Sequence, residues 1–125
     1  MKREIEFRAW DGKKMLYNKD RADFTDEYYD SPWEVFNQVL EDVIKYYELM
    51  QFTGLLDKNG IEIYEGDIVQ CNPNVKYYRQ VVFEDGFYYL VPFDDKQVWT
   101  IGVVNSSHPE TAVIGNIYEN PELLK

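Results

Sequence analysis

Short stretches in which apolar and polar residues alternate, each followed by a glycine-bearing turn, make up most of the chain. The densest is residues 52–69, with Asn59-Gly60 near its centre. Asn and Gly tolerate the positive φ angles of a two-residue hairpin turn, so this pair predicts a β-hairpin. The expected register places Leu56 opposite Ile63, and Gly66-Asp67 then reverses the chain a second time.

Two Asp-Gly pairs predict further hairpins. Asp11-Gly12 is the expected turn of a hairpin over residues 2–17, and Asp85-Gly86 is the expected turn of one over residues 77–91. The implied cross-strand pairs are Phe7 with Leu16, Phe83 with Tyr88 and Val82 with Tyr89.

The end of the chain predicts two more strands, at residues 98–104 and 112–118, and Gly115 marks a bulge in the second. Pro121 begins an expected single helical turn. Residues 18–30, in contrast, have no clean period and many charges, which is typical of a surface loop.

One longer helix is predicted after residue 30. Ser31-Pro32-Trp33-Glu34 combines a capping Ser, a Pro at the first helical position and a Glu that completes the capping box. Apolar residues then recur at helical spacing from Phe36 to Tyr47. We expect this apolar stripe to pack on the core.

These elements predict an α+β fold that is mostly β. Short strands at close spacing favour a small SH3-like β-barrel over residues 48–125. An N-terminal β-hairpin and one main, acidic α-helix, both within residues 1–47, are expected to pack on it. At 125 residues, the whole chain is expected to form a single domain.

The net charge of -10 is unevenly distributed. Residues 1–21 hold seven Lys or Arg against four Asp or Glu, residues 22–51 hold one against eight, and residues 52–125 hold five against eleven. A basic arm beside an acidic middle can attract itself, within one chain or between copies. The acidic total makes nucleic acid an unfavourable partner. The charged candidates for an interaction surface are Arg8, Lys14, Glu41 and Asp42.

Adjacent tyrosines are the most unusual feature of the composition. The pairs are Tyr28-Tyr29, Tyr46-Tyr47, Tyr77-Tyr78 and Tyr88-Tyr89. Neighbours in a strand face opposite sides of the sheet, so one ring of a strand pair is expected outside the core. Exposed Tyr rings suit protein interfaces or stacking on unpaired bases, and two-sided packing is the alternative. The interaction candidates from these pairs are Tyr28, Tyr29, Tyr77 and Tyr78.

No catalytic constellation is recognisable. Cys71 with His108 as its base lacks an orienting carboxylate, so we expect a buried Cys71 and a His108 on a surface loop. Phosphate-binding loops, dinucleotide-binding motifs and metal-ligand patterns are absent from the sequence, so no cofactor, metal or enzymatic activity is expected. The sequence contains no membrane-length apolar run and no recognisable leader, which predicts a soluble intracellular protein.

Several segments occur together in a familiar order. They are FRAWD (7–11) with KMLY (14–17), QFTGLLDKNGIEIYEGDIV (51–69), VFEDGFYY (82–89) and VIGNIYENPELL (113–124). In this combination the sequence resembles the YopX family of bacteriophage and prophage proteins. The resemblance implies a phage gene product that self-assembles in the cytoplasm of a bacterial host, and it carries over no catalytic residue. Residues 18–48 match least.

The leading hypothesis is therefore a non-enzymatic phage accessory protein that forms homo-oligomers and can bind a host protein. One alternative is an acidic nucleic-acid mimic, in which carboxylates of residues 23–48 occupy the DNA-binding groove of a host protein. A second alternative is a nucleic-acid-binding barrel that uses the exposed Tyr rings.

Overall fold

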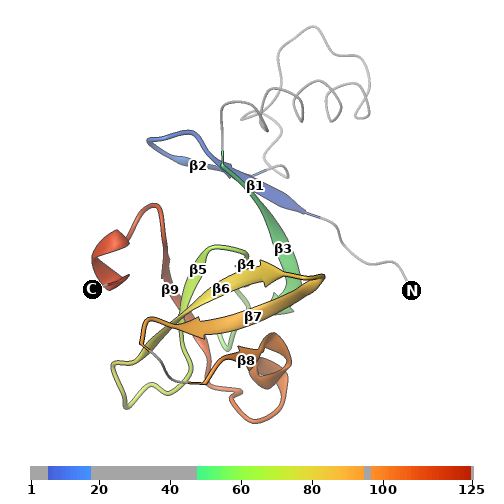
Figure 1. The fold of residues 1–125 in the computed structure, drawn as a ribbon, viewed down its shortest axis with the longest axis vertical. Coiled ribbons are helices and arrows are strands. Elements are labelled where there is room, and N and C mark those ends of the chain that lie inside the picture. The colour runs from blue at the N-terminus through green and yellow to red at the C-terminus, as the bar shows by residue number, and fades with distance from the viewer. Residues whose placement is uncertain (1–5, 18–47, 95–96, 125) are drawn as a thin grey trace, which may run out of the picture. The chain divides into compact units, whose positions relative to one another are not determined.

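The computed structural model describes residues 6–17, 48–94 and 97–124 (Figure 1). Contacts divide the chain into two compact units, residues 1–51 and 52–125, with the boundary inside one strand. That the whole chain forms one domain stays a prediction.

The described residues are mostly strand, which confirms the predicted mostly-β character. The helices among them are the short 3₁₀ helices η2 (Ile101–Asn105) and η3 (Pro121–Leu124), and η3 confirms the predicted turn at Pro121. The long helix and the surface loop expected between residues 18 and 47 lie outside the described residues.

The first unit contains a hairpin of β1 (Phe7–Trp10) and β2 (Met15–Tyr17), and β1 also pairs with the start of β3 (Glu48–Leu56). Leu16 lies opposite Ala9 rather than Phe7, so the predicted register is wrong by two residues.

The turn explains this error. The Asp11 carboxylate accepts the backbone N–H groups of Lys13 at 2.7 Å and Lys14 at 2.8 Å, so the connection between the strands spans residues 11–14 instead of two residues. These backbone hydrogen bonds also lower the pKa of Asp11.

The second half of β3 pairs with β4 (Glu62–Tyr64), and this register also differs from the prediction. Leu56 lies opposite Glu62 rather than Ile63, and β3 bulges before it, where Gly54 has a φ of 89°. Inside the bulge the Thr53 hydroxyl donates to the Ile63 carbonyl at 2.7 Å. The extra residues in β3 therefore shift the next pair to Phe52 with Tyr64.

The connection from β3 to β4 is organised by the buried Asp57. Its Oδ1 accepts the N–H groups of Asn59 at 2.8 Å and Ile61 at 2.9 Å, and its Oδ2 accepts the N–H of Val113 at 2.9 Å. Nearby, the Lys58 N–H donates to the Thr111 carbonyl at 2.9 Å. One carboxylate thus fastens this loop to the last strand.

The second unit contains a five-stranded antiparallel sheet with the order β8-β7-β6-β5-β9 (Figure 1). Four strands follow one another as a meander, and the last strand returns to pair with the first of them. The strands are β5 (Asp67–Gln70), β6 (Tyr78–Glu84), β7 (Phe87–Pro92), β8 (Trp99–Thr100) and β9 (Ala112–Asn116).

The register of β6 and β7 confirms the prediction from Asp85-Gly86. Phe83 lies opposite Tyr88 and Val82 lies opposite Tyr89. Both turn residues have positive φ, 51° at Asp85 and 85° at Gly86, as a two-residue hairpin turn requires.

The strand expected over residues 98–104 is wrong beyond Thr100, where η2 begins. A 3₁₀ helix brings residues three apart to one side, and Ile101 and Val104 have this spacing. Val104 is buried in the core cluster and Ile101 packs against it. Val103 also packs against the cluster, so this short apolar helix covers the core.

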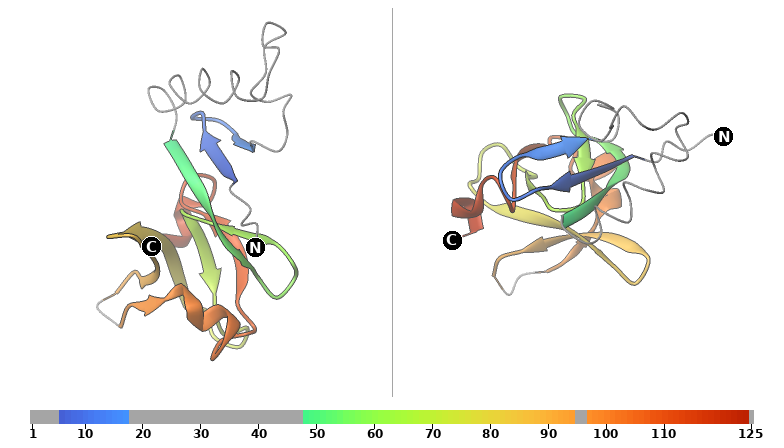
Figure 2. Two further views of the ribbon diagram at one scale, coloured as in Figure 1. Left: turned by 90° about the vertical axis from the view of Figure 1, so that its right-hand side faces the viewer. Right: turned by 90° about the horizontal axis from the view of Figure 1, so that it is seen from above.

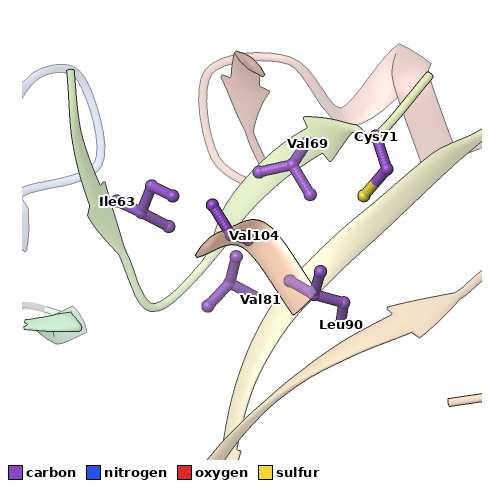
Figure 3. Close-up of a cluster of buried hydrophobic side chains, with 6 residues drawn as sticks. All are labelled: Ile63, Val69, Cys71, Val81, Leu90 and Val104. Carbon is purple, nitrogen blue, oxygen red and sulfur yellow. The ribbon is translucent and has the colours of Figure 1, made fainter. Parts of the chain in front are cut away.

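The core of the second unit is a cluster of buried side chains drawn in Figure 3. They come from β4, β5, the residue after β5, β6, β7 and η2. The members are Ile63, Val69, Cys71, Val81, Leu90 and Val104.

The predicted bulge in β9 is confirmed, because Ile68 pairs with Gly115 but Val69 pairs with Val113. At Gly115 the chain passes close to Asn120, whose Oδ1 accepts the Asn116 N–H at 3.1 Å. A Cβ atom at Gly115 would lie 2.5 Å from that Oδ1. The absence of a side chain therefore permits the turn that follows β9.

We predict that Gly115→Ala destabilises the protein by about 1–3 kcal/mol, because Asn120 must move and lose its hydrogen bond. Gly102→Ala is the matched control, since its nearest neighbour is the Thr100 hydroxyl at 4.0 Å. Urea unfolding measures the free energy of unfolding of both variants. Equal stability of the two would contradict the close packing at Gly115.

Candidate interaction surface

The structure places four of the eight predicted interaction residues. Lys14 is exposed, and Tyr77 and Tyr78 are half-buried. Arg8 is buried, with only 3% of its surface exposed, and its assignment to an interaction surface stays a prediction. The other candidates, Tyr28, Tyr29, Glu41 and Asp42, lie outside the described residues.

Tyr77 links two loops of the second unit. Its hydroxyl donates to Asp94 Oδ1 at 2.6 Å, which connects the loop before β6 with the loop after β7. Desolvation raises the pKa of Tyr77, and the hydrogen bond and negative charge of Asp94 raise it further. The phenol is thus held in its neutral form.

Arg79 is a buried cation that sequence reasoning did not single out. Its Nη1 donates to the carbonyl oxygens of Gln97 at 2.7 Å and Leu90 at 3.2 Å, and its guanidinium lies 3.6 Å from the centre of the Trp99 ring. The Arg79 side chain of β6 thereby holds the start of β8 through hydrogen bonds and a cation–π contact.

His108 lies against the same tryptophan. Its ring stacks on Trp99 with the centroids 4.3 Å apart and the planes 10° apart. The prediction of a simple surface loop residue therefore needs correction, because the ring is half-buried and packed on an aromatic side chain. No pattern in the sequence relates the positions of Trp99 and His108, so this contact could not be predicted.

The environment of Cys71 agrees with the expectation that this side chain is buried. Cys71 is buried in the core cluster, as expected. Burial raises the pKa of its thiol, although the Thr111 hydroxyl and the Arg79 charge partly offset that effect. This environment suits a small buried hydrophobe rather than a thiolate nucleophile.

The buried carboxylates of the second unit have structural roles. Asp57 caps the loop after β3, and Asp67 Oδ2 accepts the Tyr64 N–H at 2.8 Å in the turn before β5. Within the part of the chain that the structure describes, no three His, Cys, Asp or Glu side chains are grouped so as to hold a metal ion.

The most exposed aromatic side chain in the described ranges is Phe87, at 63%. It lies at the end of the β6–β7 hairpin, here called the hairpin tip (residues 83–89), which stands out from the neighbouring strands of its own unit in the view from above (Figure 2). Phe83, at 46%, is exposed on the same tip. The tip therefore presents two phenylalanine rings to solvent.

The tip has two faces with different neighbours. Phe83 contacts Tyr88 with ring centroids 4.8 Å apart, and Tyr88 packs against the core cluster. Phe87 contacts Tyr89 on the other face at 6.3 Å. The alternating pattern confirms that only one ring of the Tyr88-Tyr89 pair packs on this core cluster.

A comparison with protein families shows which family this chain belongs to. The family model described as YopX protein matches residues 6–125. The chain belongs to the YopX family. Membership of this family confirms the resemblance seen in the sequence motifs.

Two solved structures are similar to this chain over nearly its whole length. The crystal structure of protein EF1440 from Enterococcus faecalis is 32% identical with a TM-score of 0.64, and the match covers 99% of this chain and 100% of that one. Protein yopX from Bacillus subtilis is 22% identical with a TM-score of 0.54, covering 96% and 95%. The second likeness shows the fold alone. Comparison with curated proteins found no match.

Helices among the described residues of this YopX-family chain are too short or too polar to cross a membrane.

For Tyr77, we predict a pH-dependent contribution to stability. Its raised pKa belongs to the folded state, so the neutral phenol contributes fully below about pH 10 and this contribution is lost as the pH rises through the folded pKa. Wild-type stability should therefore fall more steeply above about pH 10 than that of Tyr77→Phe. Urea unfolding across this pH range measures the difference.

The Asp94→Asn background provides the control for Tyr77. The difference between Tyr and Phe at position 77 should shrink there, because the charge and the acceptor that oppose ionisation are changed. Parallel pH profiles of wild type and Tyr77→Phe would refute the contact.

For Cys71, we predict slow modification of the folded protein. Burial and the raised pKa leave little accessible thiolate, so the reaction with a disulfide reagent at pH 8 should be at least about 10-fold slower than in the urea-unfolded chain. Rapid stoichiometric reaction of the folded protein would restore a reactive thiol to consideration.

Proposed function

We propose that this YopX-family protein is a non-enzymatic accessory protein of a phage or prophage, which self-assembles in the cytoplasm of a bacterial host and offers an interaction surface to a host protein. The observation that carries this proposal is the exposure of Phe83 and Phe87 on the hairpin tip. Exposed apolar side chains that project from a fold favour association.

The surroundings of the side chains that could serve catalysis or metal binding also support an interaction protein. Cys71 is buried with a raised pKa, and the His108 ring stacks on Trp99. The described carboxylates Asp57 and Asp67 bind backbone N–H groups. These groups already have structural partners, which leaves the exposed aromatic rings as the strongest functional feature.

We further propose that the five-stranded sheet forms an SH3-like barrel. The support is its strand order, in which β9 returns beside β5 at the start of the β5–β8 meander. Bulges such as the one in β9, opposite Ile68 and Val69, increase the local twist that curls a sheet. A curled sheet of this order leaves only the short β8 and β9 as edges.

The two nucleic-acid hypotheses have less support. The acidic stretch required by a nucleic-acid mimic, residues 23–48, lies almost entirely outside the described residues. A nucleic-acid-binding barrel needs a basic groove beside its Tyr rings, whereas Tyr77 bonds a carboxylate and Arg79 is buried. Neither hypothesis gains a specific observation.

We predict that Phe87→Ser reduces the assembly, because it removes the most exposed ring of the tip. Light scattering coupled to size exclusion should give a multiple of 14.9 kDa for the wild type and a lower mass for the variant. Ile61→Ser is the matched control, since Ile61 is also exposed, at 53%, but lies in the loop before β4.

Urea unfolding should show that both variants remain folded. A wild-type mass of 14.9 kDa at all concentrations would overturn self-assembly. Equal loss of mass in Phe87→Ser and Ile61→Ser would remove the special role of the tip.

A further inference from the structure

The outer face of the hairpin tip combines aromatic rings with carboxylates. Glu84 lies directly opposite Phe87 in the β6–β7 register, and Tyr89 contacts Phe87 on the same face. Glu84 and the turn residue Asp85 are both exposed. We call these four residues, Glu84, Asp85, Phe87 and Tyr89, the acidic aromatic face.

This face has a defined geometry. The β6 and β7 strands pair without a register shift from Arg79 to Glu84, so the tip continues a regular ladder. Two positive φ values at Asp85 and Gly86 close the turn tightly. A preorganised face of this kind loses little conformational freedom when it binds.

Its chemistry selects a cationic partner. Carboxylates pair with ammonium groups, and the faces of aromatic rings attract the same cations. A lysine that meets both Glu84 and the Phe87 ring gains two favourable interactions at one position. An acidic partner would be repelled by the same carboxylates, so the face discriminates between partners by charge.

The first unit of the chain carries a matching surface. The turn between β1 and β2 exposes Lys13 and Lys14 side by side. The backbone N–H groups of both lysines are held by the Asp11 carboxylate, which fixes the turn that displays them. The positive charges of the two lysines exceed the single negative charge of Asp11, so the β1–β2 turn is basic.

We infer that the acidic aromatic face of one copy docks on the Lys13-Lys14 turn of a second copy. The inference rests on the proposed self-assembly and names the surfaces that would form it. Charge complementarity between two exposed turns of the same chain is what selects another copy as the occupant.

Such a contact joins two different surfaces and is heterologous. Each copy has one acidic aromatic face and one Lys13-Lys14 turn, so copies add head to tail. They form a closed ring if the rotation between neighbouring copies closes. Because the charges are exposed, salt screens their attraction, and the assembly weakens as ionic strength rises.

Two charge-reversal variants test the contact. Lys13→Glu with Lys14→Glu makes the turn acidic, and Glu84→Lys with Asp85→Asn makes the face basic. Asn is used at position 85 because it tolerates the positive φ of 51° found there. Lys58→Glu is the control, since Lys58 is exposed on the β3–β4 loop outside both surfaces.

We expect each double variant alone to lose assembly, with its dissociation constant raised at least about 10-fold at low salt, while Lys58→Glu retains wild-type assembly. An equimolar mixture of the two double variants should reassemble. In the mixture, an acidic face meets a basic turn and a basic face meets an acidic turn. Only a contact between copies gives this rescue.

The outcomes separate this inference from the proposed function. Wild-type protein that stays monomeric at 14.9 kDa overturns the proposed self-assembly and this inference with it. A wild-type oligomer that both double variants retain overturns only the docking of these two surfaces. Loss of assembly in both variants without rescue on mixing also overturns it.

Discussion

A single buried carboxylate joins the ends of the second unit. Asp57 accepts two N–H groups of its own loop and the N–H of Val113 in β9, 56 residues later in the chain. Hydrogen bonds to a charged acceptor contribute about 1.5–3 kcal/mol each, and a buried N–H without its acceptor costs a similar amount. The position of β9, which closes the strand order beside β5, therefore depends on this residue.

The same chemistry determines which turns were predictable. The sequence signal at Asp85-Gly86 is purely a matter of backbone φ, and the observed register agrees with it. At Asp11 and Asp57 the carboxylates instead accept N–H groups two to four residues later. These bonds lengthen the connections, and pattern reasoning that assumes two-residue turns then misplaces the partner strand.

The candidate surface was only partly predictable. Alternation along β6 and β7 correctly placed one ring of Tyr88-Tyr89 on the core cluster, because strand faces follow from local spacing. Two features instead came from long-range contacts. The Trp99–His108 stack and the Arg79 contact with Trp99 join residues that no local pattern relates.

The central claim is that YopX-family chains of this kind assemble through the hairpin tip and the Lys13-Lys14 turn. Zero-length carbodiimide cross-linking of mixed ¹⁵N-labelled and unlabelled protein tests it directly, because an amide joining Lys14 to Glu84 requires the two side chains to touch. We expect mass spectrometry to find such cross-links with mixed isotopes, which only different copies can give. Cross-links between these residues that always carry a single isotope, or an assembly with none between them, would contradict the account.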